Sequence, residues 1–397
     1  MNSQGGKVKN CLSTGNGRLA SDFGDRGGIG SYQGGNIKII GNEVYLNGQD
    51  NQDADMEISV VGAIAPITIE KNHVHNCIQG CIQIAEGGDG SVVSYNVING
   101  FGSAVSATPS SSGKWGGIRI GGGTGSAKNV RILNNVILGG LQPNTTSHAG
   151  IYVSQFDNPG LILKNNIFYN NASKDVFVHS TGITTGIDFS NNIYYKSDFA
   201  NNWYWKGSDA SSLNEWRSIS QLDNASLDVN PLFIDPVNYD FHLGVGSPAI
   251  NNGVYVGLTT DIDNQAIIGN PDIGAYEDQG PDFLPTSMSA IRSGGNRVYV
   301  LDAVFNQGGN SLNSIVINYY LSTDNKFSND DLQLLCSKTQ EILSSGQTSS
   351  LIRTTCYKPS NVMRSVNYNV LVMDDASNNV VENNEINNVG VAGVVSW

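Results

Sequence analysis

The sequence predicts an all-β protein whose first two-thirds wind into a right-handed parallel β-helix and whose last quarter forms a separate β-sandwich. Three observations carry this prediction. Glycine is abundant, at 47 of 397 residues, and charged residues make up only 14%, which disfavours long helices and suits short strands joined by tight turns. A strand-like unit recurs along the first two hundred residues. After residue 287, turn-forming residues recur about every eight to twelve positions.

The recurring unit is an apolar-alternating stretch with an aligned asparagine. Its copies are NIKIIGNEVY (36–45), PITIEKNHVHN (66–76), SVVSYNVIN (91–99), NVRILNNVILGG (129–140), LILKNNIFYNN (161–171) and GIDFSNNIYYK (186–196). The asparagines are Asn42, Asn72, Asn96, Asn135, Asn166 and Asn192, and KVKNCL places Asn10 in the same frame. Separations of about 24 to 39 residues fit one turn of a β-helix plus a variable loop. We expect each asparagine to occupy a bend and to bond the backbone of adjacent turns.

A second strand lies between successive copies of this unit. It is MEISV (56–60), CIQIA (81–85), GIRIG (117–121), GIYVS (150–154) and DVFVH (175–179). Apolar and polar residues alternate with a period of two, so one face packs inward and the other faces outward. We expect one inward column of Ile58, Ile84, Ile120, Val153 and Val178, with turns about 4.8 Å apart.

The segment after the last repeat is rich in aromatic residues. Ser212 and Glu215 form an S-x-x-E capping box, which predicts a short helix at about 213–219. Trp203, Trp205 and Trp216 are predicted to plug the open end of the apolar core, although such rings also stack on sugars.

Two further stretches carry a family resemblance. LDVNPLFIDPVNYDFHLGVGSPAINNG (227–253) and TDIDNQAIIGNPDIGAYE (260–277) resemble the closing region of secreted bacterial right-handed parallel β-helix proteins of the pectate-lyase-like superfamily. That region has a DPLF…FHL…SPAI…G…TDIDG…DIGAYE pattern, and Asn264 stands where it has its last TDIDG glycine. The resemblance is close over 186–278. It implies a β-helix over 1–278 and a secreted or cell-surface protein that acts on polysaccharide.

A linker with Pro and Gly, 279–287, precedes the predicted sandwich over 288–397. NYYLSTDNKFSNDDLQLL and VVENNEINN in this part resemble the adhesion-type immunoglobulin-like modules called CARDB, which sit beside catalytic domains in secreted and cell-surface proteins. Cys336 and Cys356 lie symmetrically about Gly346, in a predicted hairpin. A disulfide and a pair of buried thiols both fit that spacing.

The net charge of −13 excludes nucleic acid as a partner, because phosphate binding needs clustered Lys and Arg. An acidic polysaccharide would need a local basic patch or a bridging cation. No apolar run is long enough to predict a membrane span. The start of the chain lacks the apolar stretch of a signal peptide, so secretion is expected from the resemblance alone. No cap precedes the first repeat, and we expect an upstream domain or an oligomer to cover that end.

The outward positions of the second strand form the candidate site. We expect the row Glu57–Gln83–Arg119–Tyr152–Phe177, flanked by the long loops 101–116 and 140–149. A charged and aromatic row with a spacing of about 4.8 Å is close to the dimension of a sugar unit. The predicted catalytic residues are Glu57, Arg119 and Tyr152, and the predicted substrate-binding residues are Gln83, Lys114, Trp115, His148 and His179.

β-Elimination on a uronate-containing polymer is the first predicted mechanism. It requires neutralisation of a carboxylate, removal of the C5 proton and protonation of the leaving oxygen. Calcium held by Asp55, Glu57 and Glu86 would neutralise the carboxylate. Arg119 or Tyr152 would handle the proton, with a shifted pKa.

Two alternatives remain open. Asp55 with Glu57, or Glu57 with Glu86, can serve as the paired carboxylates of a glycoside hydrolase. The protein can also be a non-catalytic polysaccharide-binding or adhesion protein, since no active-site signature is evident. His73 and His75 share a strand face with metal-like spacing, but the sequence shows no third ligand, and we interpret them as outward and partly exposed.

Overall fold

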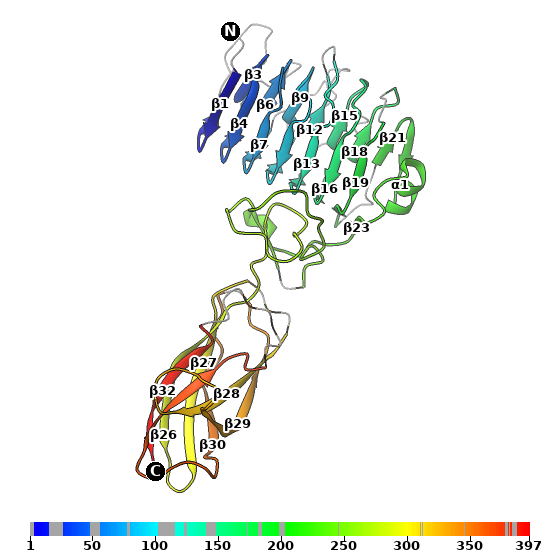
Figure 1. Cartoon of the computed structure of the whole chain (residues 1–397). Helices are drawn as coiled ribbons and strands as arrows, with labels where there is room; N and C mark the ends of the chain where they lie inside the picture. The colour runs from blue at the N-terminus through cyan, green and yellow to red at the C-terminus, as the bar shows by residue number, and fades with distance from the viewer. Residues whose placement is uncertain are drawn as a thin grey trace. The chain divides into compact units, whose positions relative to one another are not determined.

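The computed structural model describes residues 4–15, 27–47, 56–77, 80–101, 116–122, 125–139, 148–172, 174–181, 185–197, 203–244, 246–309, 311, 313–344, 346–377, 380, 382 and 387–397. The chain forms two compact units, one of residues 1–243 and 247–277 and one of residues 244–246 and 278–397 (Figure 1). No helix in the described ranges is long and apolar enough to cross a lipid bilayer.

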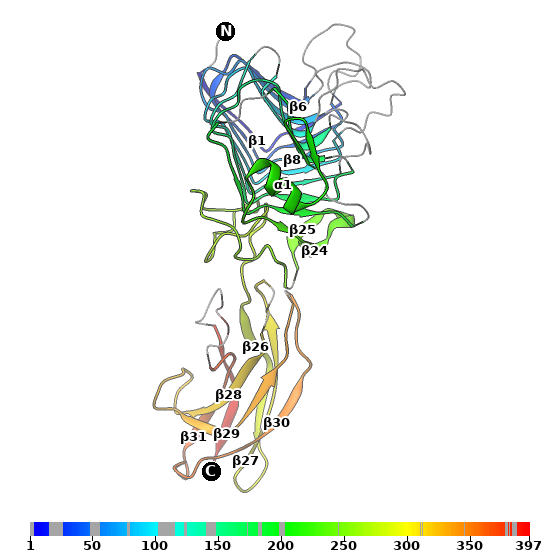
Figure 2. The same cartoon turned by 90° about the vertical axis from the view of Figure 1, so that its right-hand side faces the viewer.

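The first unit is a parallel β-helix, as the sequence predicts. Over the described residues, successive strands stack in three parallel sheets (Figures 1 and 2). Sheet A contains β1 Gln4–Lys9, β4 Gly35–Ile40, β7 Thr68–Glu70, β10 Val92–Ser94, β13 Arg131–Leu133, β16 Ile162–Lys164 and β19 Asp188–Ser190. Sheet B contains β2 Leu12–Thr14, β5 Glu43–Tyr45, β8 His73–His75, β11 Val97–Asn99, β14 Val136–Leu138, β17 Ile167–Tyr169, β20 Ile193–Tyr195 and β23 Leu227–Asp228. Sheet C contains β3 Ile29–Tyr32, β6 Met56–Val61, β9 Gly80–Ala85, β12 Gly116–Ile120, β15 Ala149–Val153, β18 Lys174–Val178, β21 Trp203–Trp205 and the antiparallel β22 Ser208–Ala210.

The interior of the coil is filled by columns of apolar side chains. Sheet C contributes two of them, because the register pairs Ile58 with Ile82 and Val60 with Ile84. The predicted single column is therefore wrong at its first member: Ile84 continues the column of Val60, whereas Ile58 lies between Ile29 and Ile82 in the other column. Both columns belong to one buried cluster that runs the length of the coil.

The aligned asparagines form a buried hydrogen-bonded ladder along the bend between sheets A and B. In each step the side-chain Nδ2 donates to the Oδ1 of the asparagine one turn further on. The donor–acceptor distances are 2.9–3.1 Å for Asn42–Asn72, Asn72–Asn96, Asn96–Asn135, Asn135–Asn166 and Asn166–Asn192. The same Oδ1 atoms accept hydrogen bonds from backbone N–H groups. The predicted bonds to the backbone are therefore present, together with a continuous series of bonds between the side chains. At the first turn the aligned residue is Cys11, whose backbone N–H donates to Asn42, and Asn10 instead aligns with Gly41.

A buried carboxyl ends the ladder. Asp223 is 1% exposed and accepts from Asn192 Nδ2 at 3.0 Å, Trp216 Nε1 at 2.6 Å and Tyr194 Oη at 3.1 Å. Burial raises the pKa of Asp223, although these hydrogen bonds oppose the shift. The Asp223 carboxyl can end the ladder because it needs no further partner for a donor: an ionised carboxylate only accepts hydrogen bonds, and a protonated one has a single O–H to donate.

The predicted helix is present as α1, Leu213–Ser220. The Ser212 side chain accepts from the backbone N–H of Glu215, as expected of an N-cap, while the Glu215 carboxylate reaches back to Ser211. Trp203 and Trp216 are completely buried in the core of the coil. The prediction that tryptophans plug its open end is confirmed for these two residues.

The segment with the family resemblance folds back over the outer face of sheet B. It contains β24 Phe233–Asp235, the 3-10 turn η1 Pro236–Asn238 and β25 Asp240–Leu243 (Figure 2). Its apolar residues form a second cluster with the outer side chains of sheet B. Gly274 has a φ of +110°, and a Cβ there would lie 2.7 Å from the Ile167 side chain, so this close approach requires glycine. Asn264, in the glycine position of the pattern, has a φ of +66°, which asparagine tolerates.

The second unit is a β-sandwich. One sheet has the order β26 Phe283–Arg292, β27 Arg297–Asn306, β30 Ile352–Tyr357, and the other has β29 Leu332–Gln340, β28 Ile315–Ser322, β31 Asn367–Met373, β32 Val389–Ser396. Strand β26 begins inside the predicted linker 279–287; it is an edge strand, where Pro285 costs no ladder bond. Cys336 and Cys356 form a disulfide between β29 and β30, which belong to different sheets rather than to one hairpin.

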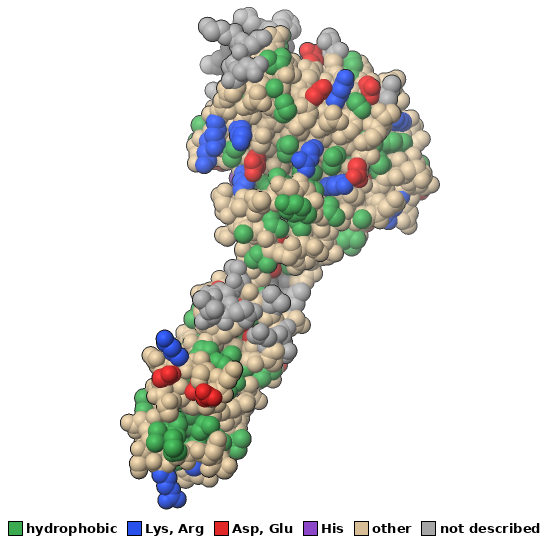
Figure 3. All heavy atoms as spheres, in the orientation of Figure 1, with side chains coloured by type: hydrophobic (Ala, Val, Ile, Leu, Met, Phe, Trp, Pro, Cys, Tyr) green, Lys and Arg blue, Asp and Glu red, His purple; other side chains and the backbone are tan. Residues whose placement is uncertain are grey.

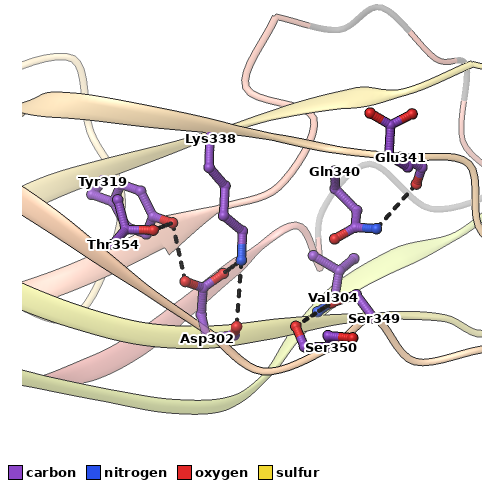
Figure 4. Close-up of polar contacts among 9 residues, drawn as sticks. All are labelled: Asp302, Val304, Tyr319, Lys338, Gln340, Glu341, Ser349, Ser350 and Thr354. Carbon is purple, nitrogen blue, oxygen red and sulfur yellow. Dashed lines mark hydrogen bonds and ion pairs between the residues drawn. The ribbon is translucent and has the colours of Figure 1, made fainter.

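A buried polar group lies between the strands of this sandwich (Figure 4). Asp302 is fully buried, accepts from Lys338 Nζ at 2.6 Å and from Tyr319 Oη at 3.0 Å, and Tyr319 also contacts Thr354 at 3.1 Å. These contacts satisfy the carboxylate inside the core. The CARDB-like assignment of this unit stays a prediction.

Replacing an interior ladder residue should destabilise the first unit. Asn96→Ala removes the acceptor of the Asn72 amide and backbone and the donor to Asn135. Because buried groups are left without partners, we expect the free energy of unfolding to fall by at least about 2 kcal/mol. Urea unfolding measures the change, with Asn214→Ala on the exposed side of α1 as the control. Equal effects of the two substitutions would contradict the role of the ladder.

The closing segment should show a pH-dependent stability. His242 on β25 lies 2.9 Å from Asp263 and 2.6 Å from Asp240, and these hydrogen bonds raise the pKa of His242 to about 9 despite partial burial. Because the pKa of His242 is higher in the folded state than in the unfolded state, its protonation stabilises the folded protein. This stabilisation is complete below about pH 6.5 and is lost as the pH rises through about 9. His242→Gln should therefore lower stability near pH 6, by up to about 1 kcal/mol because the pair is half exposed, and not near pH 10. A difference that is constant between those pH values in urea unfolding would contradict this.

Candidate functional site

The outer face of sheet C carries one continuous row of side chains. The strand register aligns Ser59, Gln83, Arg119, Tyr152, Phe177 and Tyr204, one on each successive turn. Four of the five predicted row members therefore lie where the sequence placed them. Polar and cationic groups occupy the early turns and aromatic rings occupy the later ones.

Arg119 lies at the centre of this row. Its Nη1 donates to Gln83 Oε1 at 3.3 Å, and Gln83 Nε2 donates to Ser59 Oγ at 3.3 Å. Burial lowers the pKa of Arg119, while the neighbouring Tyr152 hydroxyl opposes that shift. A Cβ on Gly122 would lie 2.7 Å from the guanidinium, so glycine at that turn leaves room for the arginine head group.

Tyr152 is the next residue along the row. It is fully buried, and the described residues offer its hydroxyl no hydrogen-bond partner. Burial raises the pKa of Tyr152 to about 12, although the charge of Arg119 lowers it. The hydroxyl is therefore protonated at neutral pH and can act as a proton donor.

An aromatic stack continues the row beyond Tyr152. The rings of Tyr152 and Phe177 are 5.0 Å apart and those of Phe177 and Tyr204 are 4.4 Å apart, both nearly parallel. Lys174 forms an ion pair with Asp209 and lies 5.7 Å from the Tyr204 ring. The stack fixes the orientation of the Tyr152 ring, because an offset parallel arrangement restricts rotation.

Glu57 does not belong to the row, and this part of the prediction is wrong. Ser59 pairs with Gln83, which aligns Glu57 with Cys81. Its carboxyl is 1% exposed and accepts from the backbone N–H of Asn47 at 3.0 Å and from Asn47 Nδ2 at 2.6 Å. Glu57 thus points into the coil instead of toward a substrate.

The alignment of Glu57 reveals a feature that sequence reasoning missed. At the bend between sheets B and C, residues on either side of the loop meet on several of the described turns. Asn47 bonds Glu57, Cys77 forms a disulfide with Cys81, Asn171 bonds Asp175, and a Cβ on Gly117 would lie 3.4 Å from the Phe101 ring. The short Cys77–Cys81 spacing was the available signal, because a disulfide that spans three residues can only close a tight loop.

Three of the other predicted site residues, His148, His179 and Glu86, lie at the ends of sheet C strands. His148 directly precedes β15, and burial lowers its pKa. His179 follows β18, with its Nδ1 3.1 Å from Thr181 Oγ1 and its ring 6.4 Å from that of Phe177. Glu86 follows β9 with a φ of +55°. Asp55, Lys114 and Trp115 lie outside the described residues.

The predicted calcium site loses one ligand in the structure. Glu57 is engaged with Asn47, and within the described ranges no group of three His, Cys, Asp or Glu side chains could hold a metal ion. The third predicted ligand, Asp55, lies outside the described residues, so the calcium site stays a prediction.

Sheet A presents a different charged surface. Lys7 and Lys9 on β1 and Lys38 on β4 are exposed, and the register places Lys7 beside Lys38. Figure 3 shows basic and acidic side chains interspersed over the rest of this face. The lysines give the negatively charged protein a local basic patch, although this patch lies on a different sheet from the row.

Comparison with known proteins yields one structural match. No protein-family model matches the chain, and no curated protein matches it. The crystal structure of pectate lyase Pel9A matches with a TM-score of 0.45 at 14% identity, covering 69% of this chain and 68% of that one. This match assigns no activity to the chain.

Truncation of Glu57 should affect folding rather than chemistry. Glu57→Ala removes the carboxylate that accepts from the backbone N–H of Asn47 and one of the two acceptors of its side-chain amide, which also donates to Ser13 O. Loss of these buried hydrogen bonds costs about 1–3 kcal/mol. We expect a lower midpoint in urea unfolding and unchanged turnover per folded molecule. Glu70→Ala, a partly exposed carboxyl on sheet A, is the control. Unchanged stability together with lost turnover would restore Glu57 as a catalytic candidate.

Proposed function

We propose that this protein is a secreted polysaccharide lyase that cleaves a uronate-containing polymer along the outer face of sheet C. The observation that carries the proposal is the register of β12 and β15, which places Arg119 beside Tyr152 on adjacent turns. The lowered pKa of Arg119 suits it to accept a proton, and the protonated hydroxyl of Tyr152 suits it to donate one in the same reaction.

The proposed reaction is a β-elimination. Arg119 in its neutral form takes the proton from C5 of the uronate, the electron pair forms the C4–C5 double bond, and the C4–O bond breaks. Tyr152 gives its proton to the departing oxygen. The Gln83 amide on the neighbouring turn can hydrogen-bond the uronate carboxylate, which stabilises the charge that develops at C5.

Access to Tyr152 sets a condition on this chemistry. Its side chain is 0% exposed, whereas Arg119 is partly exposed. The polymer therefore meets Arg119 first, and the proton transfer from Tyr152 requires local opening around the hydroxyl. A water-poor site of this kind strengthens the interaction of the guanidinium with a carboxylate.

Two disulfides support the secreted location. Cys77–Cys81 and Cys336–Cys356 are both formed, and such bonds persist in oxidising compartments outside the cytosol.

Calcium stays a prediction that rests on Asp55 and Glu86 alone.

Binding without catalysis is the second candidate function. The complete burial of the Tyr152 hydroxyl favours it, because a donor that never opens cannot reach a leaving oxygen. The hydrolase alternative loses its central carboxyl, since every proposed pair included Glu57 and that side chain faces Asn47.

Substitutions in the row test the lyase proposal. Tyr152→Phe keeps the ring stack but removes the proton donor, and Arg119→Ala removes the proposed base, so each should lower turnover at least about 100-fold. Pectate, alginate and glycosaminoglycans are the substrates, and the ultraviolet absorbance of unsaturated products is the readout. Lys38→Ala removes an exposed cation from sheet A and serves as the control.

Three outcomes would overturn the proposal. New reducing ends without ultraviolet absorbance would indicate hydrolysis. Retention on a polysaccharide gel without either signal would indicate binding alone. Unsaturated products that form equally fast with Tyr152→Phe and Arg119→Ala would place the lyase site elsewhere.

A further inference from the structure

A second surface of the β-helix has the shape and chemistry of a ligand site. It is a groove of about 490 Å³ on the outer face of sheet B, within the range of about 300–1,000 Å³ typical of small-molecule sites. Its lining comes from the early turns of sheet B and from the closing segment: Gly41, Asn42, Glu43, His73, His75, Asn76, Val97, Asn99, Tyr239 and Phe241.

The groove exists because the closing segment covers only the later turns of sheet B. One outward column of this sheet runs Glu43, His73, Val97, Val136. Val97 and Val136 are buried in the cluster with the closing segment, whereas Glu43 and His73 are exposed. The sequence thus changes from apolar to polar where the cover ends, and Phe241 forms the wall at that boundary.

His75 is held rigidly at the floor of the groove. Its ring stacks on Tyr45 with centroids 4.5 Å apart, its Nε2 lies 3.1 Å from Glu43 Oε1, and its Nδ1 lies 3.2 Å from Asn76 Nδ2. These contacts on both ring nitrogens and on the ring face orient the imidazole before any ligand arrives.

Tyr239 forms the opposite wall in a costly conformation. It follows η1 with a φ of +65°, and 63% of the residue is exposed. A left-handed backbone is unfavourable for a bulky side chain, and an exposed ring gains little from burial. Its ring packs edge-on against Phe241, with centroids 6.5 Å apart, and most of it stays exposed at the groove, although glycine would fit the backbone better.

The charges of the groove select its ligand. Its lining contains Glu43 and no lysine or arginine, and the charge of Asp263 acts on His73. An anionic sugar would be repelled. Carboxylate, amide and imidazole groups beside the exposed ring of Tyr239 instead match a neutral sugar, whose hydroxyls need hydrogen-bond partners and whose apolar face stacks on a ring.

We propose that this groove binds a segment of a neutral polysaccharide. Tyr239 stacks on one sugar ring, and Glu43, Asn76 and Asn99 bond its hydroxyls. The site is separate from the row on sheet C and does not depend on the lyase activity. It would hold a neutral stretch of a mixed glycan while sheet C meets a charged one.

Tyr239→Gly is the decisive variant. It removes the ring and relieves the positive φ, so the protein should fold at least as stably as the parent in urea unfolding. Affinity electrophoresis in gels with xyloglucan, glucomannan, galactomannan or laminarin measures binding. We expect retardation of the parent on at least one of these glycans, about tenfold weaker binding by Tyr239→Gly, and near-parental binding by Tyr239→Phe. Tyr255→Ala, at another tyrosine with 72% exposure, is the matched control and should bind as the parent does.

Several results would overturn the proposal. They are no retardation on any of the four neutral glycans, retardation on polygalacturonate alone, or equal binding by the parent and Tyr239→Gly. Arg119→Ala should leave this binding unchanged, because Arg119 lies on sheet C. A loss of lyase activity with Arg119→Ala therefore does not affect the groove, and a loss of groove binding with Tyr239→Gly does not affect the lyase proposal.

Discussion

The hydrogen-bonded asparagine ladder is the constraint on which the rest of the β-helix depends. Each buried amide uses its donor and acceptor on neighbouring turns, and a shift of one turn against the next would leave both unsatisfied at a high cost. The ladder therefore holds sheets A and B in register, because its residues lie at the bend that joins them. The strands of sheet C stack on the same successive turns, which brings Arg119 beside Tyr152 in its outer row.

Much of this architecture could be predicted from residue patterns alone. The repeated asparagine marks a bend, the period of two marks the strands, and Ser212 marks the start of the helix, because each of these depends on local chemistry. The row from Gln83 to Phe177 was predictable for the same reason, since its strands have similar lengths and sequences.

The misplaced Glu57 shows where such patterns fail. An offset of two residues keeps every apolar side chain on the same face, so alternation cannot detect it. The predicted row aligned Glu57 with Gln83, and therefore Ile58 with Ile84, whereas the register pairs Ile58 with Ile82 and Ser59 with Gln83. The groove on sheet B was also beyond sequence reasoning, because Tyr239 and His75 are far apart in the chain and only the fold brings them together.

The paired residues at the bend between sheets B and C affect which changes of sequence this protein can tolerate in evolution. A hydrogen bond joins positions 10 residues apart in one turn, and a disulfide or a hydrogen bond joins positions 4 apart in others. On these three turns the chain therefore leaves and re-enters the coil between two bonded residues. Insertions and deletions between the bonded residues need not propagate into the neighbouring coils, so the scaffold can exchange whole loops there while its interior stays the same.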